Sequence, residues 1–182
     1  MIEHSISKRY ARALISVATG ESLNTVDEYG RQLAAFSEAC LVNANLLLAL
    51  SNRHFDLQAR ERIVDGVTSK LELSRSVINF LKLLVRKGRI QFFANIFEEY
   101  QNFAHGLMNR EVMTVVSATD LSQDQYDTLA GLFGKVTGKS MVLKRQKQPS
   151  VLGGVRVHIR DKIYDYTIKN QLEQMKQRLL NQ

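Results

Sequence analysis

The spacing of apolar residues changes once along this chain, near residue 108, and no other feature of the sequence limits the fold as strongly. Before that point apolar residues recur at helical spacing, with no sustained two-residue alternation. Beyond it come short runs rich in β-branched residues, and Val155, Val157 and Ile159 alternate with polar residues. This order predicts an α+β protein, with an all-α six-helix bundle in residues 1–108 and a small α/β domain in residues 109–182.

The N-terminal pattern predicts six helices that share one apolar core. They are expected at residues 5–19, 23–39, 45–50, 57–71, 74–87 and 90–108. Residues with helix-capping chemistry lie near three of the predicted ends. Gly20 is expected to end the first helix, Asp56 to cap the start of the fourth, and Gly88 to follow the end of the fifth.

The C-terminal pattern predicts four strands and two helices. The strands are expected at residues 111–117, 141–144, 155–159 and 163–166. One helix is expected to begin at a capping box in residues 122–125 and to end at Gly138, and the other to occupy residues 167–181. Gly153 and Gly154 come directly before the third strand, where glycine allows close backbone packing, so we interpret both as structural residues.

Composition excludes several classes of protein. The 182 residues are 45% hydrophobic and 24% charged with a single proline, which is typical of a folded domain and not of collagen or disorder. One cysteine, Cys40, and four scattered histidines provide neither a disulfide nor a zinc site, so we expect a reducing compartment, no metal and no cofactor. The longest apolar run, residues 46–50, is far shorter than the roughly 20 residues of a membrane span, and no signal peptide is expected.

The sequence contains no convincing catalytic motif. Residues 134–140 end in Gly-Lys-Ser, but only three residues separate the two glycines, whereas a phosphate-binding loop needs four. We interpret this segment as the end of a helix. Asp161 and Asp165 have the form of an acid/base pair, yet they lie at a predicted hairpin turn and a helix start, where aspartate is favoured for backbone reasons. We therefore predict that the protein is not an enzyme.

The first and fifth predicted helices are apolar over more of their circumference than one core face requires. In the first helix a core-facing stripe of about 100° widens to about 200° when a second stripe is included. The first stripe holds Ile6, Tyr10, Ala13, Leu14 and Val17, and the second holds Ala11, Ile15 and Ala18. In the fifth helix the apolar arc covers about 220°. Either both helices are central in the bundle, or together they form an apolar groove for a partner's amphipathic helix.

Three segments resemble one known family along essentially the whole chain. They are Ser7-Lys8-Arg9-Tyr10-Ala11-Arg12-Ala13-Leu14, then Asn79-Phe80-Leu81-Lys82-Leu83-Leu84 with Gly88-Arg89, and Val151-Leu152-Gly153-Gly154-Val155-Arg156-Val157 before Asp161 and Asp165. They are similar to the delta subunit of bacterial F-type ATP synthase, whose mitochondrial relative is the oligomycin-sensitivity-conferring protein. The family usually has glycine before the turn aspartate, where this chain has Arg160, and a positive φ there would cost arginine about 1 kcal/mol.

The resemblance implies a non-catalytic stator subunit, present in one copy in a hetero-oligomeric complex at the cytoplasmic face of the bacterial inner membrane, without inserting into it. It implies that the helical domain holds the N-terminal helix of an alpha subunit and that the C-terminal domain joins the peripheral stalk b subunits, so that torque is coupled to ATP synthesis. In this family the alpha helix lies between the first and fifth helices. The role is carried over to Tyr10, Ala13, Leu14, Phe80, Leu83 and Leu84.

The charge distribution leaves a second function open. Residues 106–182 carry 12 basic and 7 acidic side chains, a larger surplus than in the preceding part. Such a surplus suits an acidic stalk surface, but it also suits a nucleic acid. The basic residues Lys144, Arg145, Lys147, Arg156 and Arg160 near Tyr164 and Tyr166 have the composition of a site that combines phosphate contacts with base stacking. The resemblance implies a protein partner and no nucleic acid.

Overall fold

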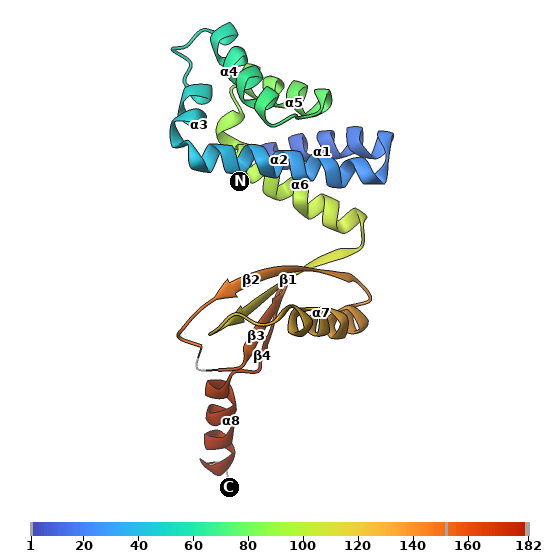
Figure 1. Ribbon diagram of the computed structural model, residues 1–182, viewed down its shortest axis with the longest axis vertical. Coiled ribbons are helices and arrows are strands. Elements are labelled where there is room, and N and C mark those ends of the chain that lie inside the picture. Colours follow the sequence, from blue (N-terminus) through green and yellow to red (C-terminus); the bar gives the residue numbers. More distant parts are fainter. Residues whose placement is uncertain (1, 152, 181–182) are drawn as a thin grey trace. The chain divides into compact units, whose positions relative to one another are not determined.

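The computed structural model describes residues 2–151 and 153–180, which divide into two compact units, Met1–Ala104 and His105–Gln182. Unit 1 is helical and unit 2 combines a four-stranded sheet with two helices (Figure 1). The predicted α+β class is confirmed. The boundary between the units falls within the last turn of a helix, slightly before the predicted position at residue 108.

Unit 1 contains the six predicted helices. Their bounds are α1 Ile2–Glu21, α2 Leu23–Val42, α3 Ala44–Ser51, α4 Leu57–Lys70, α5 Arg75–Arg86 and α6 Phe93–Leu107, with a short 3-10 helix, η1, at Ile90–Phe92. The prediction for Gly20 is wrong. This glycine lies inside α1, and the break comes at Ser22, whose hydroxyl accepts the Thr25 N–H and caps α2. Asp56 and Gly88 do lie at the predicted helix ends.

The core of unit 1 is built around α2 and α6. Four residues of α2 at helical spacing are buried, namely Val26, Tyr29, Leu33 and Phe36. The Phe36 ring meets Phe93 edge-on at 4.9 Å, and the buried Tyr100 hydroxyl donates to the Val26 carbonyl at 2.9 Å. Because its polar atom is hydrogen-bonded, Tyr100 contributes its apolar area to the core without leaving a buried donor unpaired.

Unit 2 begins with a strand–helix–strand crossover. Strand β1, Arg110–Ser117, pairs in parallel with β2, Ser140–Lys147, and α7, Gln123–Thr137, connects them. A parallel pair needs such a crossover, and the capping box of Ser122 with Gln125 starts the connecting helix as predicted. Strand β2 is longer than the predicted 141–144, because its polar second half pairs with β1 at the edge of the sheet, where charged residues are common.

The sheet is completed by an antiparallel hairpin. Strands β3, Val155–Ile159, and β4, Lys162–Asp165, extend the strand order to β2-β1-β3-β4. Helix α7 packs on one face of the sheet, over a core that contains Met113, Tyr126, Phe133 and Val157. Helix α8, Ile168–Leu180, follows β4 and extends away from the sheet (Figure 1). Asn181, the last residue of the predicted helix, and Leu152 of the quoted motif lie outside the described residues.

Candidate functional site

Helix α1 faces the core with three small residues and with Leu14 and Ile15, and it leaves its other apolar residues partly or largely exposed. Ser7, Ala11 and Ala18 are fully buried. Ala13 is exposed, Val17 is 49% exposed, and Tyr10 is half-buried. The predicted core-facing stripe is therefore wrong except for Leu14, and the second stripe is the buried one. Small side chains allow α1 to lie close against α2, and that close packing decides which face is buried.

Helix α5 presents one large apolar side chain to the surface. Leu83 is 41% exposed, whereas Phe80 and Leu84 are buried in the bundle. On the neighbouring flank of the helix, Lys82 pairs with Asp65 of α4 at 2.6 Å and Arg86 pairs with Glu61. The Arg86 guanidinium holds the pKa of Glu61 below its usual range through a hydrogen bond. These pairs hold the flank of α5 next to Leu83 against α4.

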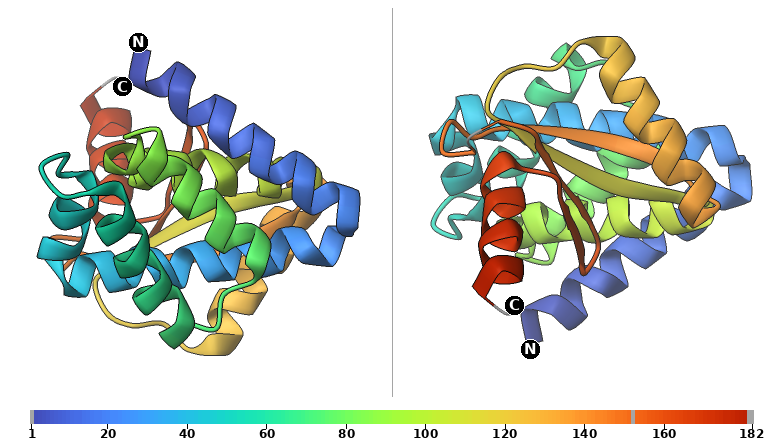
Figure 2. Two further views of the ribbon diagram at one scale, coloured as in Figure 1. Left: turned by 90° about the horizontal axis from the view of Figure 1, so that it is seen from above. Right: turned by 90° about the horizontal axis from the view of Figure 1, so that it is seen from below.

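Helices α1 and α5, which carry these exposed apolar residues, run alongside each other in Figures 1 and 2. We call Ile6, Tyr10, Ala13 and Val17 of α1, together with Leu83 of α5, the outer stripe. Of the six residues predicted to hold a partner helix, Tyr10, Ala13 and Leu83 belong to it. Leu14, Phe80 and Leu84 are buried and belong to the core of unit 1, where they pack within the bundle.

A polar hollow runs along α1 beside the outer stripe. Its volume is about 1020 Å³, and the residues that line it are His4, Ser5, Lys8, Arg9, Arg12, Ala13 and Ser16. His4 Nδ1 lies 3.2 Å from Glu99 of α6, and the Arg12 guanidinium lies over the Phe103 ring at 5.5 Å. These two contacts attach the charged side of α1 to α6 and leave Arg9 facing outward.

In unit 2, the two glycines of the quoted motif pack closely against residues 166–168, where α8 begins. Gly153 and Gly154 have φ angles of 70° and 77°, in the left-handed region. A Cβ atom added at Gly154 would lie 2.3 Å from the Tyr166 carbonyl oxygen, so the two backbone segments could not pack as they do. Asp165 stabilises the same junction, since its carboxylate accepts the Thr167 N–H at 3.0 Å and pairs with Arg156 at 2.8 Å. Hydrogen bonds from Thr167 lower the pKa of Asp165, and Arg156 adds to this effect.

Arg160 lies in the turn between β3 and β4, at the position where the family usually has glycine, and it has a positive φ of 49°. Its guanidinium pairs with Glu111 of β1, which also accepts a hydrogen bond from Lys139 at 2.9 Å. Burial alone would raise the pKa of Glu111, but the hydrogen bonds from Lys139 and Arg160 outweigh it and lower that pKa. Asp161 lies exposed in the same turn, and no sequence pattern predicted the ion pairs with Glu111.

Most of the basic residues that suggested nucleic-acid binding are used within the chain. Lys147 pairs with Asp120 at 2.8 Å, and Arg156 and Arg160 pair as described above. Arg145 stacks over the Tyr126 ring at 4.4 Å and donates to Gln123. Tyr164 packs against Phe133 with ring centroids 4.9 Å apart, whereas Tyr166 is 55% exposed. This arrangement disfavours the nucleic-acid alternative.

Helix α8 carries an apolar stripe that the described residues of unit 2 leave largely uncovered. Ile168, Leu172, Met175 and Leu179 are 50%, 61%, 59% and 75% exposed. Their spacing of four, three and four residues is that of a coiled-coil seam. The sequence predicted the stripe, but it gave no signal that the stripe lacks an intramolecular partner.

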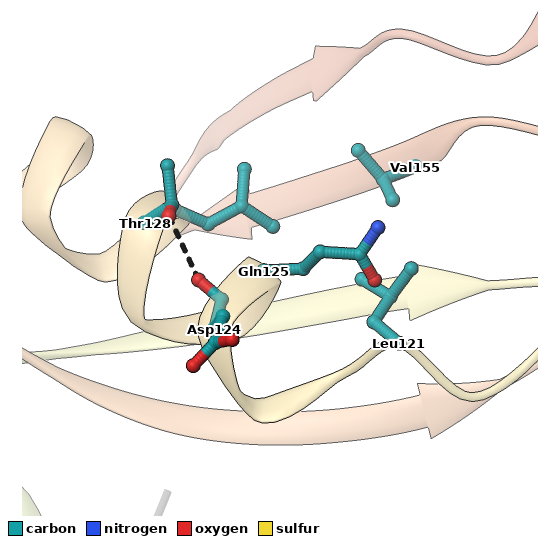
Figure 3. A pocket seen from close by; sticks show the side chains of 6 residues that line it. Leu121, Asp124, Gln125, Thr128 and Val155 are labelled. Carbon is teal, nitrogen blue, oxygen red and sulfur yellow. Dashed lines mark hydrogen bonds between the residues drawn. The ribbon is translucent and has the colours of Figure 1, made fainter.

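An apolar cleft of about 360 Å³ lies between the start of α7 and β3 (Figure 3). Leu121, Leu129 and Val155 provide its apolar surface, and Gln125 is engaged in the capping box. The Thr128 hydroxyl donates to the Asp124 carbonyl at 2.7 Å. The segment that resembled a phosphate-binding loop lies at the other end of α7, where Gly138 ends the helix in the left-handed conformation.

In residues 2–151 and 153–180, no three His, Cys, Asp or Glu side chains come together as a metal site. No single helix of the described part has both the length and the apolarity of a membrane span. Helix α2 and residues 45–51 have the required length and apolarity only when they are taken together, and a bend of 104° separates them.

Comparison with known proteins decides the family. The model of the family "ATP synthase delta (OSCP) subunit" matches residues 6–179. The chain belongs to this family. Two relatives named ATP synthase subunit delta are 36% identical over 172 residues, in Geotalea uraniireducens, and 34% identical over 175 residues, in Geobacter metallireducens. The first alignment covers 94% of each chain and the second 96% of each.

A solved structure shares the fold. A chain in the cryo-EM structure of the Toxoplasma gondii mitochondrial ATP synthase hexamer superposes with a TM-score of 0.67 at 18% identity, covering 96% of this chain and 97% of that one. Family membership confirms the predicted role as a non-catalytic stator subunit of an F-type ATP synthase. The protein is thus part of a membrane-associated ATP synthase complex.

Proposed function

We propose that this delta subunit links the catalytic head to the peripheral stalk at the cytoplasmic face of the bacterial inner membrane, with one copy in each complex. Unit 1 holds the N-terminal helix of an alpha subunit on the outer stripe, and unit 2 binds the b subunits through α8. The link keeps the head from turning with the rotor, so that proton-driven torque is coupled to ATP synthesis.

The observation that carries the proposal for unit 1 is the exposed apolar surface shared by α1 and α5. An amphipathic helix binds by laying its apolar face against such a surface. Tyr10, Val17 and Leu83 provide apolar area at the surface, while Leu14, Phe80 and Leu84 beneath them fix the two helices that carry it. Because the supporting core is present without the partner, binding requires little reorganisation of unit 1.

The exposed seam of α8 supports the proposal for unit 2. A helix of 13 residues is marginally stable alone in water, and the stripe of Ile168, Leu172, Met175 and Leu179 has no cover within the described residues of unit 2. A 4-3-4 spacing packs against another helix of similar repeat. We therefore assign this seam to a helix of the stalk b subunits.

Calorimetric titration of the full chain with a peptide that copies the alpha N-terminal helix tests the first surface. Saturable one-to-one binding with a negative heat-capacity change is expected, because apolar area is buried. Leu83→Asp should weaken binding at least tenfold while leaving the circular dichroism spectrum unchanged. Leu132→Asp is the matched control, because Leu132 is a similarly exposed leucine in unit 2. Equal binding by both variants would contradict the assignment to the outer stripe.

Capture of a soluble b-subunit fragment tests the second surface. Leu172→Asp should abolish capture, because it places a charge in the middle of the seam, and it should leave binding of the alpha peptide unchanged. Gln174→Asp, on the polar side of the same helix, is the matched control. Undiminished capture by Leu172→Asp would show that the stalk binds elsewhere on unit 2.

A further inference from the structure

Arg9 lies beside the outer stripe and has no acidic partner among the residues that the structure describes. At about 100° per residue, Arg9 is about 40° around α1 from Ala13, a member of the stripe. Its neighbours one turn away on α1 are Ser5, Ile6, Arg12 and Ala13, none of them acidic. No carboxylate of the described chain pairs with Arg9, whereas on α5 both Lys82 and Arg86 are paired with carboxylates of α4.

Arg9 differs from the other cations of α1 in its position on the helix, since Lys8 lies about 140° around α1 from Ala13. Arg12 is directed over Phe103, and His4 contacts Glu99, so both lie toward α6. Arg9 is exposed between two small residues, Ser5 and Ala13. Its long side chain is therefore free to reach across the edge of the stripe, where the polar hollow begins.

We infer that the helix held on the outer stripe carries carboxylates along the edge that faces α1, and that Arg9 selects and orients it by pairing with them. The inference rests on the proposed binding of an amphipathic helix. The guanidinium fork matches a carboxylate geometrically, and complementary charge along one edge fixes which way round a helix lies on an apolar surface. A free anion is a poorer fit, because the stripe and the cation lie side by side along α1, as the apolar face and edge of a single helix do.

The size of the effect follows from the exposure of the pair. Exposed ion pairs contribute modestly, so reversing the charge at Arg9 is expected to weaken binding roughly three- to tenfold without abolishing it. The apolar stripe supplies the affinity, and Arg9 supplies preference between partner helices. The contribution of Arg9 should fade as salt screens it.

The test uses the full chain and three peptides with the apolar face of the alpha N-terminal helix. Their edge positions all carry Glu, all Gln or all Lys. The wild-type chain should bind the Glu peptide most tightly and the Lys peptide least tightly, and about 0.5 M salt should remove most of the difference. Arg9→Glu should reverse the order and bind the Lys peptide better than the wild-type chain does. Arg12→Glu should have a smaller effect, and Arg62→Glu, an exposed reversal on α4, should have none.

Two outcomes would overturn the inference in different ways. Equal affinity for the three peptides, unchanged by Arg9→Glu but lost in Leu83→Asp, would leave the outer stripe as the binding site and remove the role of Arg9. Absence of binding for every peptide by a folded chain would remove the proposed function of unit 1 and the inference with it.

Discussion

Helices α1 and α8 both carry an exposed apolar stripe, but they differ in what supports it. The opposite face of α1 is buried in the bundle through Ser7, Ala11 and Ala18, so its outer stripe is held in place before a partner arrives. Helix α8 has exposed side chains around most of its circumference and is anchored mainly at its first turn, by Gly153, Gly154 and Asp165. The comparison indicates that the exposed stripe of α1 is supported by packing along the helix, whereas the stripe of α8 is supported mainly at one end of its helix.

The largest expected effect tests the close packing of Gly154 against the start of α8. Gly154→Ala should destabilise unit 2 by about 2–5 kcal/mol, because it combines a left-handed backbone with a Cβ atom placed 2.3 Å from a carbonyl oxygen. Chemical denaturation followed by circular dichroism should show an earlier transition for unit 2 and an unchanged one for unit 1.

Gly131→Ala provides the control for that substitution. Gly131 lies within α7, and a Cβ atom added there would meet nothing within 4 Å. Alanine should stabilise this helix by up to about 1 kcal/mol. Equal destabilisation by the two variants would show that Gly154 is not packed against the start of α8 as tightly as the geometry indicates.

The next effect separates the core of unit 1 from its outer stripe. Leu84→Ala should lower the free energy of unfolding by about 2–5 kcal/mol, because Leu84 is fully buried and its removal leaves a cavity. Leu83→Ala, one residue earlier, should cost less than about 1 kcal/mol, because Leu83 is 41% exposed. Urea denaturation measures both, and similar losses would place Leu83 in the core and remove it from the outer stripe.

The smallest expected effect is a difference in acid sensitivity between the units. Folding lowers the pKa of three carboxylates in unit 2, namely Glu111, Asp120 and Asp165. Among the described residues of unit 1, it clearly lowers the pKa of one carboxylate, Glu61. A carboxylate whose pKa is lowered by folding stabilises the native state above its unfolded pKa, and that stability is lost as the pH falls through the folded pKa.

Below about pH 4, where unfolded Asp and Glu become protonated, unit 2 should therefore lose stability earlier than unit 1. Thermal melts followed by near-ultraviolet signals of each unit at pH 7 and below 4 measure the difference. Glu111→Gln should reduce it, since Glu111 pairs with both Lys139 and Arg160. Parallel loss in both units would contradict the account.

Much of the fold could be predicted because local patterns and tertiary structure agree. The helical repeat of unit 1 and the capping box of α7 act within a few residues, so the sequence contains the whole signal. The hairpin of β3 and β4 was predicted by alternation, since one of its faces is buried. The polar half of β2 escaped prediction, because its strand conformation depends on pairing with a neighbour 30 residues away in sequence.

The candidate site was harder to predict, because it depends on which face of a helix its neighbours cover. Tyr10 and Val17 have more apolar surface to bury than Ser7 and Ala11, yet close packing on α2 buries the smaller residues. For the same reason three of the six predicted binding residues belong to the core. That Arg9 is unpaired and the seam of α8 uncovered among the described residues are properties of the assembled units, which no local pattern contains.

The central claim is that one chain holds two partners at once on separate surfaces. Native mass spectrometry of the full chain, mixed with the alpha N-terminal peptide and a soluble b-subunit fragment, measures this directly. The account predicts a complex of all three components, from which Leu83→Asp removes only the peptide and Leu172→Asp only the fragment. Mutually exclusive binding of the two partners, or loss of both through either substitution, would contradict it.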